Sequence, residues 1–124
     1  MATMAEVEGF LTKKFNLKKE DEKKYYGRWP MPNNRSQLVL IDIYDDKLVI
    51  SSPFAEVSAL PWPAAMKAAD EFVFGVVVLG SGHYCLRHVI PLADIDESEV
   101  EWGLDVMSWC ADHLEKNTVG GDKL

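Results

Sequence analysis

The sequence predicts an α+β fold, in which an antiparallel sheet of about five strands packs with three helices in the order α-β-β-β-α-β-β-α. Three observations predict it. Apolar runs on both sides of Gly80-Ser81-Gly82 indicate one β-hairpin, and apolar runs around Asp45-Asp46 indicate another. The spacing of apolar residues near the C-terminus predicts a long amphipathic helix. Strands joined by hairpins are antiparallel, and helices placed between them can cover one face of the sheet.

The composition is typical of one globular domain, expected to span residues 1–124. Hydrophobic residues make up 48% of the chain and charged residues 27%, unlike the composition of disordered segments. The net charge of -7 argues against nucleic acid as a partner. No segment reaches the ~18 apolar residues of a membrane span, and the N-terminus shows no export signal. We therefore expect a cytoplasmic protein without a membrane partner.

Charge is distributed unevenly along the chain. Basic residues gather in the first quarter, and acidic residues gather over residues 94–105. Charge runs of this kind are usually solvated faces. A further interpretation is that the basic and partly aromatic segment 16–29 contacts an acidic partner surface, or the acidic start of the last helix of another copy.

The first quarter of the chain predicts a helix and a strand. A helix is expected over residues 3–15, because Thr3 and Glu6 have the spacing of a capping box. A charged connector is expected over residues 16–22. Residues 23–29 are rich in tyrosine and tryptophan and predict a short strand, which ends at the prolines and asparagines that follow.

The first predicted hairpin comes next. Residues 36–44 read SQLVLIDIY and predict a strand, Asp45-Asp46 predicts the turn, and residues 47–52 predict the partner strand. Pro53 is expected to end that strand, because proline has no amide proton to donate to the ladder.

A second helix is predicted that begins near Pro61 and Pro63 and continues over residues 64–71. Ser58 or a neighbour is its expected cap, and Pro61 and Pro63 fall in or near its first turn, where a missing amide proton costs nothing. The helix leads directly into residues 72–79. The valine- and phenylalanine-rich composition of this run predicts a strand that is buried on both faces, or nearly so.

The strand after the central turn shows an alternating pattern, and Pro91 is expected to end its pairing. We expect one face to carry Tyr84, Leu86, His88 and Ile90, and the other to carry Cys85, Arg87 and Val89.

The last helix has the clearest signals. Asp96 can cap its free amides, and Glu99 stands three residues later. Two apolar stripes run along it. The first, predicted to face the core, contains Val100, Leu104, Met107, Ala111 and Leu114. The second contains Trp102, Val106, Trp109 and His113. Two interpretations of the second stripe stay open: it broadens the core, or its two tryptophans meet a second subunit.

The sequence shows no catalytic motif with specific spacing, so we expect a non-enzymatic protein without catalytic residues. We expect neither a cofactor nor a metal, because the three histidines and two cysteines lack the spacing of ligands. Cys85 and Cys110 are expected to be buried and reduced. Asp42, within an apolar strand, is interpreted as facing the open side of the sheet or as paired with Lys47 or Arg87.

Motifs in the C-terminal half carry a family resemblance. They are the apolar strand that ends at Gly80-Ser81-Gly82, the strand YCLRHVIPL, the acidic link ADIDESEV and the helix WGLDVMSWCADHLEK. In these motifs, and in the order of its elements, the chain resembles the type III secretion chaperone-like fold. Within that fold it resembles the bacterial YbjN-type family of sensory transduction regulators. The resemblance implies one chaperone-like domain over residues 1–124, a small acidic homodimer that binds an unfolded stretch of another protein.

Two function hypotheses follow. The first is a non-enzymatic protein-binding or regulatory module, chaperone-like and homodimeric, with Trp102, Val106 and Trp109 as its candidate interface. The alternative is a small-ligand sensor domain that binds a metabolite between the sheet and the helices. The residues that favour the alternative are aromatic and are more often core residues: Tyr25, Tyr26, Trp29 and Trp62.

Overall fold

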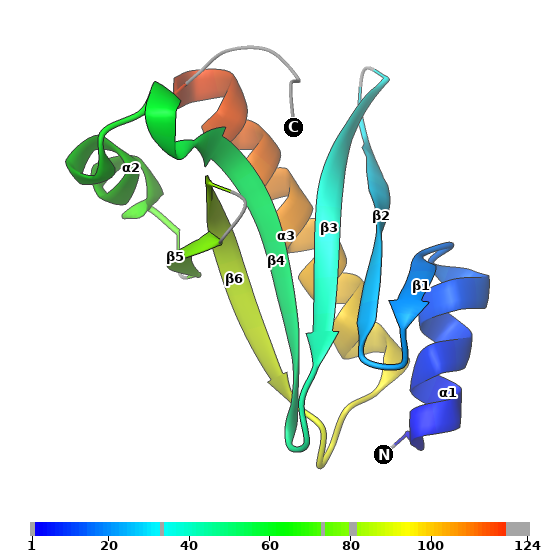
Figure 1. The fold of residues 1–124 in the computed structure, drawn as a ribbon. Helices are drawn as coiled ribbons and strands as arrows, with labels where there is room; N and C mark the ends of the chain where they lie inside the picture. The colour runs from blue at the N-terminus through cyan, green and yellow to red at the C-terminus, as the bar shows by residue number, and fades with distance from the viewer. Residues whose placement is uncertain (1, 33, 73, 80–81, 119–124) are drawn as a thin grey trace.

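The computed structural model of the chain describes residues 2–32, 34–72, 74–79 and 82–118. Over these residues, six strands form one antiparallel sheet in the order β1-β2-β3-β4-β6-β5 (Figure 1). The strands are Lys18–Asp21 (β1), Lys24–Met31 (β2), Arg35–Ile43 (β3), Lys47–Glu56 (β4), Gly75–Leu79 (β5) and His83–Pro91 (β6). The α-helices are Met4–Gly9 (α1), Trp62–Ala69 (α2) and Glu97–Thr118 (α3). A π-helical segment, Phe10–Lys14, continues α1, and a short 3-10 helix spans Val57–Ala59.

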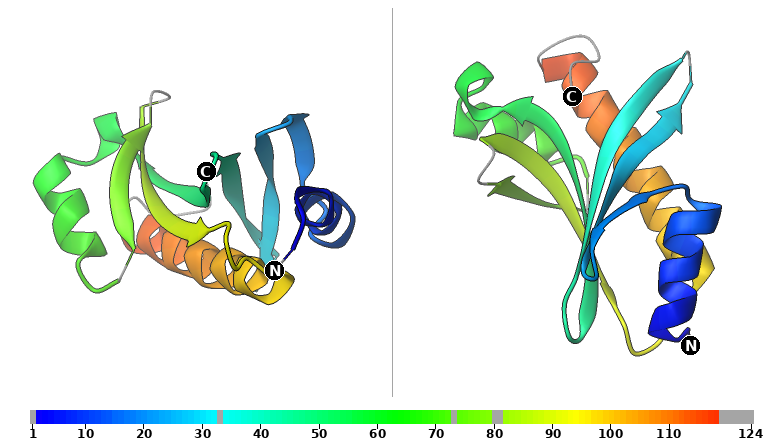
Figure 2. Two further views of the ribbon diagram at one scale, coloured as in Figure 1. Left: turned by 90° about the horizontal axis from the view of Figure 1, so that it is seen from below. Right: turned by 45° about the vertical axis from the view of Figure 1, so that its right-hand side comes forward.

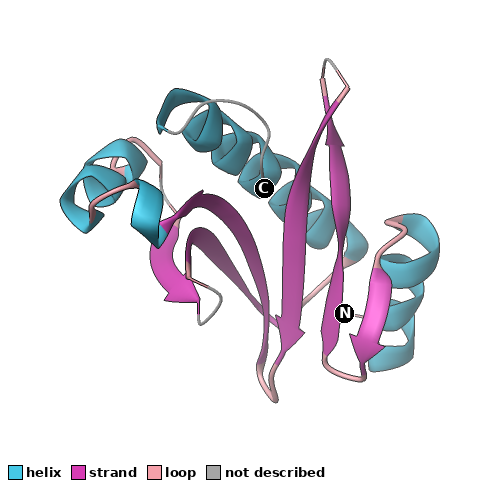
Figure 3. Cartoon of the chain, turned by 45° about the horizontal axis from the view of Figure 1, so that its top comes forward, coloured by secondary structure: helices cyan, strands magenta, loops and turns pink. Residues whose placement is uncertain are grey.

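The long helix α3 lies on one face of the sheet, while α1 and α2 lie at opposite edges (Figures 1 and 2). The other face carries no helix in the described part of the chain (Figure 2). The strands are strongly twisted (Figure 3). The predicted α+β class is confirmed, with six strands where about five were expected. None of the described helices is long and apolar enough to cross a membrane.

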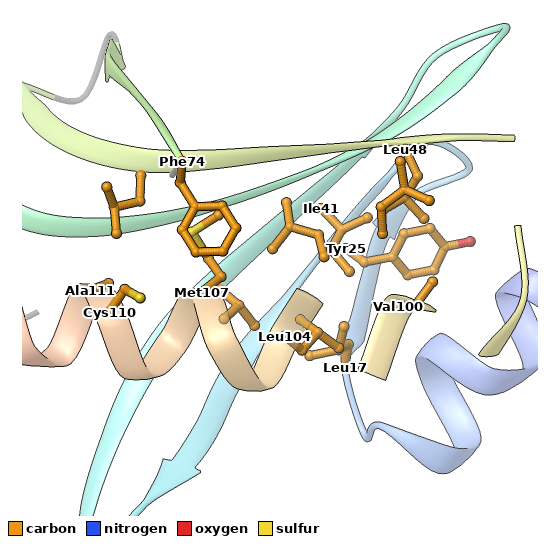
Figure 4. Close-up of a cluster of buried hydrophobic side chains, with 14 of the residues drawn as sticks. Leu17, Tyr25, Ile41, Leu48, Phe74, Val100, Leu104, Met107, Cys110 and Ala111 are labelled. Atoms are coloured by element: carbon orange, nitrogen blue, oxygen red, sulfur yellow. The ribbon is translucent and has the colours of Figure 1, made fainter. Parts of the chain in front are cut away.

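The hydrophobic core lies between the sheet and α3. All five residues of the predicted core stripe are buried: Val100, Leu104, Met107, Ala111 and Leu114. They pack with buried aliphatic residues of the central strands, such as Ile41 of β3 and Leu48 of β4 (Figure 4). Ile41 lies opposite Ile50 of β4, which is also buried. Full burial of one such side chain contributes about 1.5–3 kcal/mol, so this layer supplies much of the driving force for folding.

The caps of the first and last helices follow the predicted chemistry. The backbone N–H of Glu6 donates to Oγ1 of Thr3, and the N–H of Thr3 donates to Oε1 of Glu6, each over 3.1 Å. These two hydrogen bonds make the predicted capping box. At α3, the N–H of Glu99 donates to Oδ1 of Asp96 over 2.9 Å, which confirms Asp96 as the residue that caps this helix.

The sixth strand, β1, lies within the segment 16–22 that was predicted to be a connector. Its four residues are all exposed and charged, so the sequence shows no alternation of apolar and polar residues that would predict a strand. Backbone pairing with β2 holds it in place, with Lys18 opposite Tyr26 and Lys19 opposite Tyr25. The ammonium of Lys19 also bonds a carboxylate oxygen of Glu8 over 2.6 Å.

Pro53 does not end its strand, contrary to the prediction. The strand β4 continues to Glu56, and Pro53 lies opposite Cys85 of β6. The register between β4 and β6 shifts between Pro53 and Ala55. Strands tolerate proline at a bulge of this kind, because the regular hydrogen bonding between the strands is already interrupted there.

The second helix is present, but it has a different cap from the predicted one and ends two residues earlier. α2 spans Trp62–Ala69, and its N-cap residue is Pro61, without a side-chain hydrogen bond. Ser58 lies in the preceding 3-10 helix instead. Pro63 falls within the first turn, as predicted.

The apolar run 72–79 is not a strand buried on both faces. Of the described residues in this run, Gly75–Leu79 form the strand, and β5 lies at the edge of the sheet, where Val78 is 59% exposed. Phe74 instead projects toward α3 just before the strand begins (Figure 4). The hairpin itself is confirmed by the pairing of Leu79 with His83; residues 80 and 81 of its predicted turn lie outside the described residues.

The alternation predicted for β6 is present. Tyr84, Leu86 and Ile90 are buried, and His88 is half-buried, on the face toward α3. On the other face, Val89 is 47% exposed and Arg87 is half-buried, but Cys85 is buried, so the contrast between the faces is clear only toward the end of the strand. The same rule places Asp42 of β3 on the helix-free face, between Lys24 of β2 and Val49 of β4 in the register, so the open-face interpretation of Asp42 is confirmed.

Candidate protein-interaction surface

The second stripe of α3 lies beside the core and is largely open to solvent. Trp102 is 50% exposed and Trp109 is 54% exposed, while Val106 between them is half-buried. Residues that follow one another at steps of three and four lie on the same side of a helix. The predicted interface residues therefore form one continuous surface, which we call the tryptophan stripe: Trp102, Val106 and Trp109.

Trp102 belongs to an aromatic cluster built from three parts of the chain. The ring centroids of Trp102 and His88 are 5.6 Å apart, and Phe74 lies 5.4 Å from His88 and 6.3 Å from Trp102. Aromatic pairs at these spacings add about 0.5–1.5 kcal/mol to the burial of their surfaces. These contacts connect α3 to β6 and to the segment that enters β5.

Trp109 belongs to a second cluster farther along the helix. Its indole stacks on the imidazole of His113, with centroids 5.3 Å apart and planes at 8°. Phe72 meets both rings edge-on, at 6.4 Å from Trp109 and 5.9 Å from His113. Nε2 of His113 also lies 3.7 Å from a carboxylate oxygen of Glu71. Each tryptophan is thus held in place by neighbours and still presents about half of its surface to solvent.

Sequence reasoning found the two tryptophans and missed the residues that hold them. Phe72 and Phe74 were predicted to lie in a buried strand. In the structure they lie between α2 and β5, and they pack on Trp109 and Trp102 of α3. The available signal was a pair of phenylalanines, two residues apart, just before a valine-rich run. This spacing does not reveal that Phe72 and Phe74 pack on α3 and that the strand begins only after them.

A shallow groove lies beside Trp102. It is lined by residues 88–91 of β6 and by Ser98, Glu99 and Trp102 from the first turns of α3. Burial lowers the pKa of His88 from its ordinary value, and the negative charge of Glu99 acts in the opposite direction. Near neutral pH the imidazole in this groove is therefore uncharged.

The acidic start of α3 contacts the basic N-terminal quarter within the same chain. The ammonium of Lys14 forms an ion pair with Glu97, and this hydrogen bond raises the pKa of Lys14. Nε1 of Trp29 donates a hydrogen bond to Oδ1 of Asp105 over 2.7 Å. The contact between the N-terminal quarter and the acidic start of α3, which was predicted between two copies, is thus made in part within one chain.

The two cysteines are free and buried, as predicted. Cys85 is 0% exposed and Cys110 is 4% exposed, and burial raises the pKa of each thiol to about 11. Thiolates are the reactive form of cysteine, so neither residue suits nucleophilic chemistry near neutral pH. Among the residues that the structure describes, no three histidine, cysteine or carboxylate side chains gather as a metal site would require.

Comparison with known proteins identified no relative of this chain. No protein-family model matches this chain, and neither do the curated proteins or the solved structures with which it was compared. The resemblance to the YbjN-type family therefore stays a prediction.

Proposed function

We propose that this chain is a non-enzymatic protein-binding module of the chaperone-like kind, and that it acts as a homodimer through the tryptophan stripe of α3. The observation that carries the proposal is the pair of half-exposed indoles, Trp102 and Trp109, on one side of a single helix. Large apolar groups grouped on a surface commonly mark a protein contact. Tryptophan is also among the residues most enriched where binding energy concentrates.

The geometry of the stripe favours binding over a purely structural role. Each indole is fixed by a histidine and a phenylalanine, so little side-chain entropy is lost when a partner covers it. One helix from each copy, related by a two-fold axis, would place the same stripe on both sides of the contact. The family resemblance and the net charge of -7 agree with an acidic dimer.

Sedimentation velocity tests the dimer with a matched pair of variants. Trp109→Ser removes one indole from the stripe, while Trp62→Ser removes an indole that is 68% exposed on another helix, α2. We expect the wild type and Trp62→Ser to sediment as dimers and Trp109→Ser to shift toward the monomer, because truncation of a central tryptophan costs ~2 kcal/mol or more of binding. A wild type that stays monomeric at all accessible concentrations would show that the dimer does not form.

Polypeptide binding is tested separately with an unfolded probe. Reduced and carboxymethylated α-lactalbumin cannot refold and offers extended segments to a binding protein. We expect this probe to co-elute with the wild-type chain in gel filtration. Native, disulfide-bonded α-lactalbumin is the control and should not co-elute. Co-elution of both forms, or of neither, would contradict a chaperone-like function.

A further inference from the structure

The face of the sheet that carries no helix in the described part of the chain presents an arginine on β6. Arg87 lies opposite Ser51 of β4 on one side and opposite Gly75 of β5 on the other. Residues paired in this way share a face, and Ser51 follows the core residue Ile50, so Arg87 points away from α3. A Cβ added at Gly75 would meet no atom within 4 Å. Arg87 therefore stands between two small residues, with open space on the β5 side.

The guanidinium of Arg87 has few partners within the chain. Its only hydrogen bond among the described residues runs from Nε to Oγ of Ser51 over 3.4 Å, which is longer than the usual ~3 Å. This contact directs the side chain over β4, the strand that separates β6 from β3. Arg87 is half-buried, and the planar fork of N–H donors on a guanidinium matches a carboxylate. The described residues offer no carboxylate to this fork.

Asp42 of β3 is the acidic counterpart on the same face. It lies opposite Val49 of β4, which in turn lies opposite Val89 of β6. Arg87 is thus two strands away and two residues along, so ordinary strand spacings put the Cα atoms of Asp42 and Arg87 roughly 12 Å apart. Lys24 of β2 lies opposite Asp42 on its other side. In the described part of the chain, Asp42 makes no side-chain hydrogen bond or ion pair with either basic residue.

This arginine and this aspartate line one hollow, which has a volume of about 680 Å³. Sites for small molecules commonly have volumes of roughly 300–1,000 Å³. The other two acidic residues of the hollow have partners: Oδ1 of Asp45 lies 3.8 Å from Nζ of Lys23, and Oδ1 of Asp46 lies 3.3 Å from Nζ of Lys47. The hollow therefore holds one acidic group and one half-buried guanidinium that the chain itself does not pair.

The geometry points to a binding site in this hollow for a small zwitterion, a molecule that carries a carboxylate and an ammonium group at the two ends of a short apolar chain. Its carboxylate would accept hydrogen bonds from Arg87, and its ammonium group would donate to Asp42. Tyr44 and Leu79 line the same hollow and supply apolar surface for the chain between the two ends. The site lies on the opposite face of the sheet from α3, so it does not depend on the proposed dimer.

Three matched ligands test whether both ends are recognised. The probes are 4-aminobutanoate, butanoate, which lacks the ammonium group, and butylamine, which lacks the carboxylate. Glycine and 6-aminohexanoate extend the series to shorter and longer chains. The readout is an NMR shift titration of the full ¹⁵N-labelled chain at constant ionic strength, because salt screens charges. We expect the best zwitterion to bind about tenfold more tightly than butanoate or butylamine, since each end adds a charge-assisted contact.

Two variants assign the ends of the ligand, and each contains its own control for folding. Asp42→Asn should weaken binding of the zwitterion to the level of butanoate, while butanoate itself binds as it does to the wild type. Arg87→Gln should weaken binding of the zwitterion to the level of butylamine, while butylamine binds as before. Lys67→Gln, at an exposed position of α2, should change none of these affinities.

The outcomes separate this site from the proposed dimer. Equal affinity for the matched ligands, no saturable binding at any chain length, or a preference that survives both Asp42→Asn and Arg87→Gln would each overturn the zwitterion site. Tighter binding of pentanedioate, which carries a carboxylate at both ends, would also overturn it and would implicate Lys24 in place of Asp42. None of these results would affect a dimer that Trp109→Ser dissociates.

Discussion

Arg35 of β3 and Asp112 of α3 form a nearly enclosed ion pair, in which Nε and Nη2 of Arg35 lie 2.9 and 2.8 Å from Oδ1 of Asp112. Only 19% of the arginine side chain and 15% of the aspartate side chain are exposed. The pair connects the sheet to the last helix near Trp109, because both residues line a hollow with Trp109 and His113. It therefore helps to fix the part of α3 that presents the tryptophan stripe.

Removal of the charge on Asp112 should be costly. We expect Asp112→Asn to lower the free energy of unfolding by about 1–3 kcal/mol, because hydrogen bonds to charged groups are strong where water is excluded. The control is Glu97→Gln, which breaks the ion pair with Lys14 at side chains that are 43% and 51% exposed. That change should cost much less, since solvent screens exposed pairs. Urea unfolding measures both; equal losses would contradict the distinction.

The cluster around Trp102 should make stability depend on pH. Burial lowers the pKa of His88 in the folded chain, so the unfolded chain binds a proton more readily. The contribution of His88 to stability is present above the unfolded pKa of about 6.5 and is lost as the pH falls from there through the lowered folded pKa. Urea midpoints at pH of about 7.5 and 5 measure this loss.

His88→Phe supplies the comparison, because phenylalanine keeps an aromatic ring and cannot be protonated. We expect its urea midpoint to fall less between the two pH values than the midpoint of the wild type. A variant whose midpoint falls as steeply as that of the wild type would show that other groups carry the acid sensitivity.

The sequence predicted those elements whose apolar residues repeat with a clear period. The core stripe of α3 repeats at steps of three and four residues, and all of its members are buried. β3 alternates between half-buried and buried residues, as its sequence indicated. Where local pattern and tertiary packing agree, one sequence is enough to assign an element.

The missed features depend on pairing between distant segments. β1 carries no apolar pattern and exists because β2 offers it a pairing edge. The continuation of β4 through Pro53 depends on a bulge against β6. β5 begins only at Gly75, because Phe74 just before it packs on Trp102 of α3. No local signal encodes the relative lengths of two strands.

The two thiols should be inert in the folded chain. Cys85 and Cys110 are buried, and burial raises the pKa of each to about 11, so few thiolates are present at pH of about 8. We expect Ellman's reagent to react slowly with the native protein and to titrate both thiols rapidly in urea. Mass spectrometry of the native protein should show both cysteines free. Rapid reaction in native buffer, or a bridge between the two cysteines without added oxidant, would contradict this prediction.

Two glycines in helices should respond oppositely to alanine. Gly9 has helical backbone angles, and a Cβ there would meet no atom within 4 Å. Gly103 packs α3 against the sheet, and a Cβ there would lie 2.8 Å from Cδ1 of Ile50 and 3.2 Å from Cδ2 of His88. We expect Gly9→Ala to raise the free energy of unfolding by about 0.5–1 kcal/mol, because alanine loses less backbone entropy in a helix.

Gly103→Ala gains the same helix propensity but must displace two packed side chains. Overpacking of a dense core costs typically 1–3 kcal/mol, so we expect a net loss of about 1 kcal/mol. The displacement should also reach the aromatic cluster, because His88 contacts Trp102, and the tryptophan emission of Gly103→Ala should shift while that of Gly9→Ala should not. Stabilisation of both variants in urea, with unchanged emission, would show that α3 does not approach the sheet as closely as the contacts of Gly103 indicate.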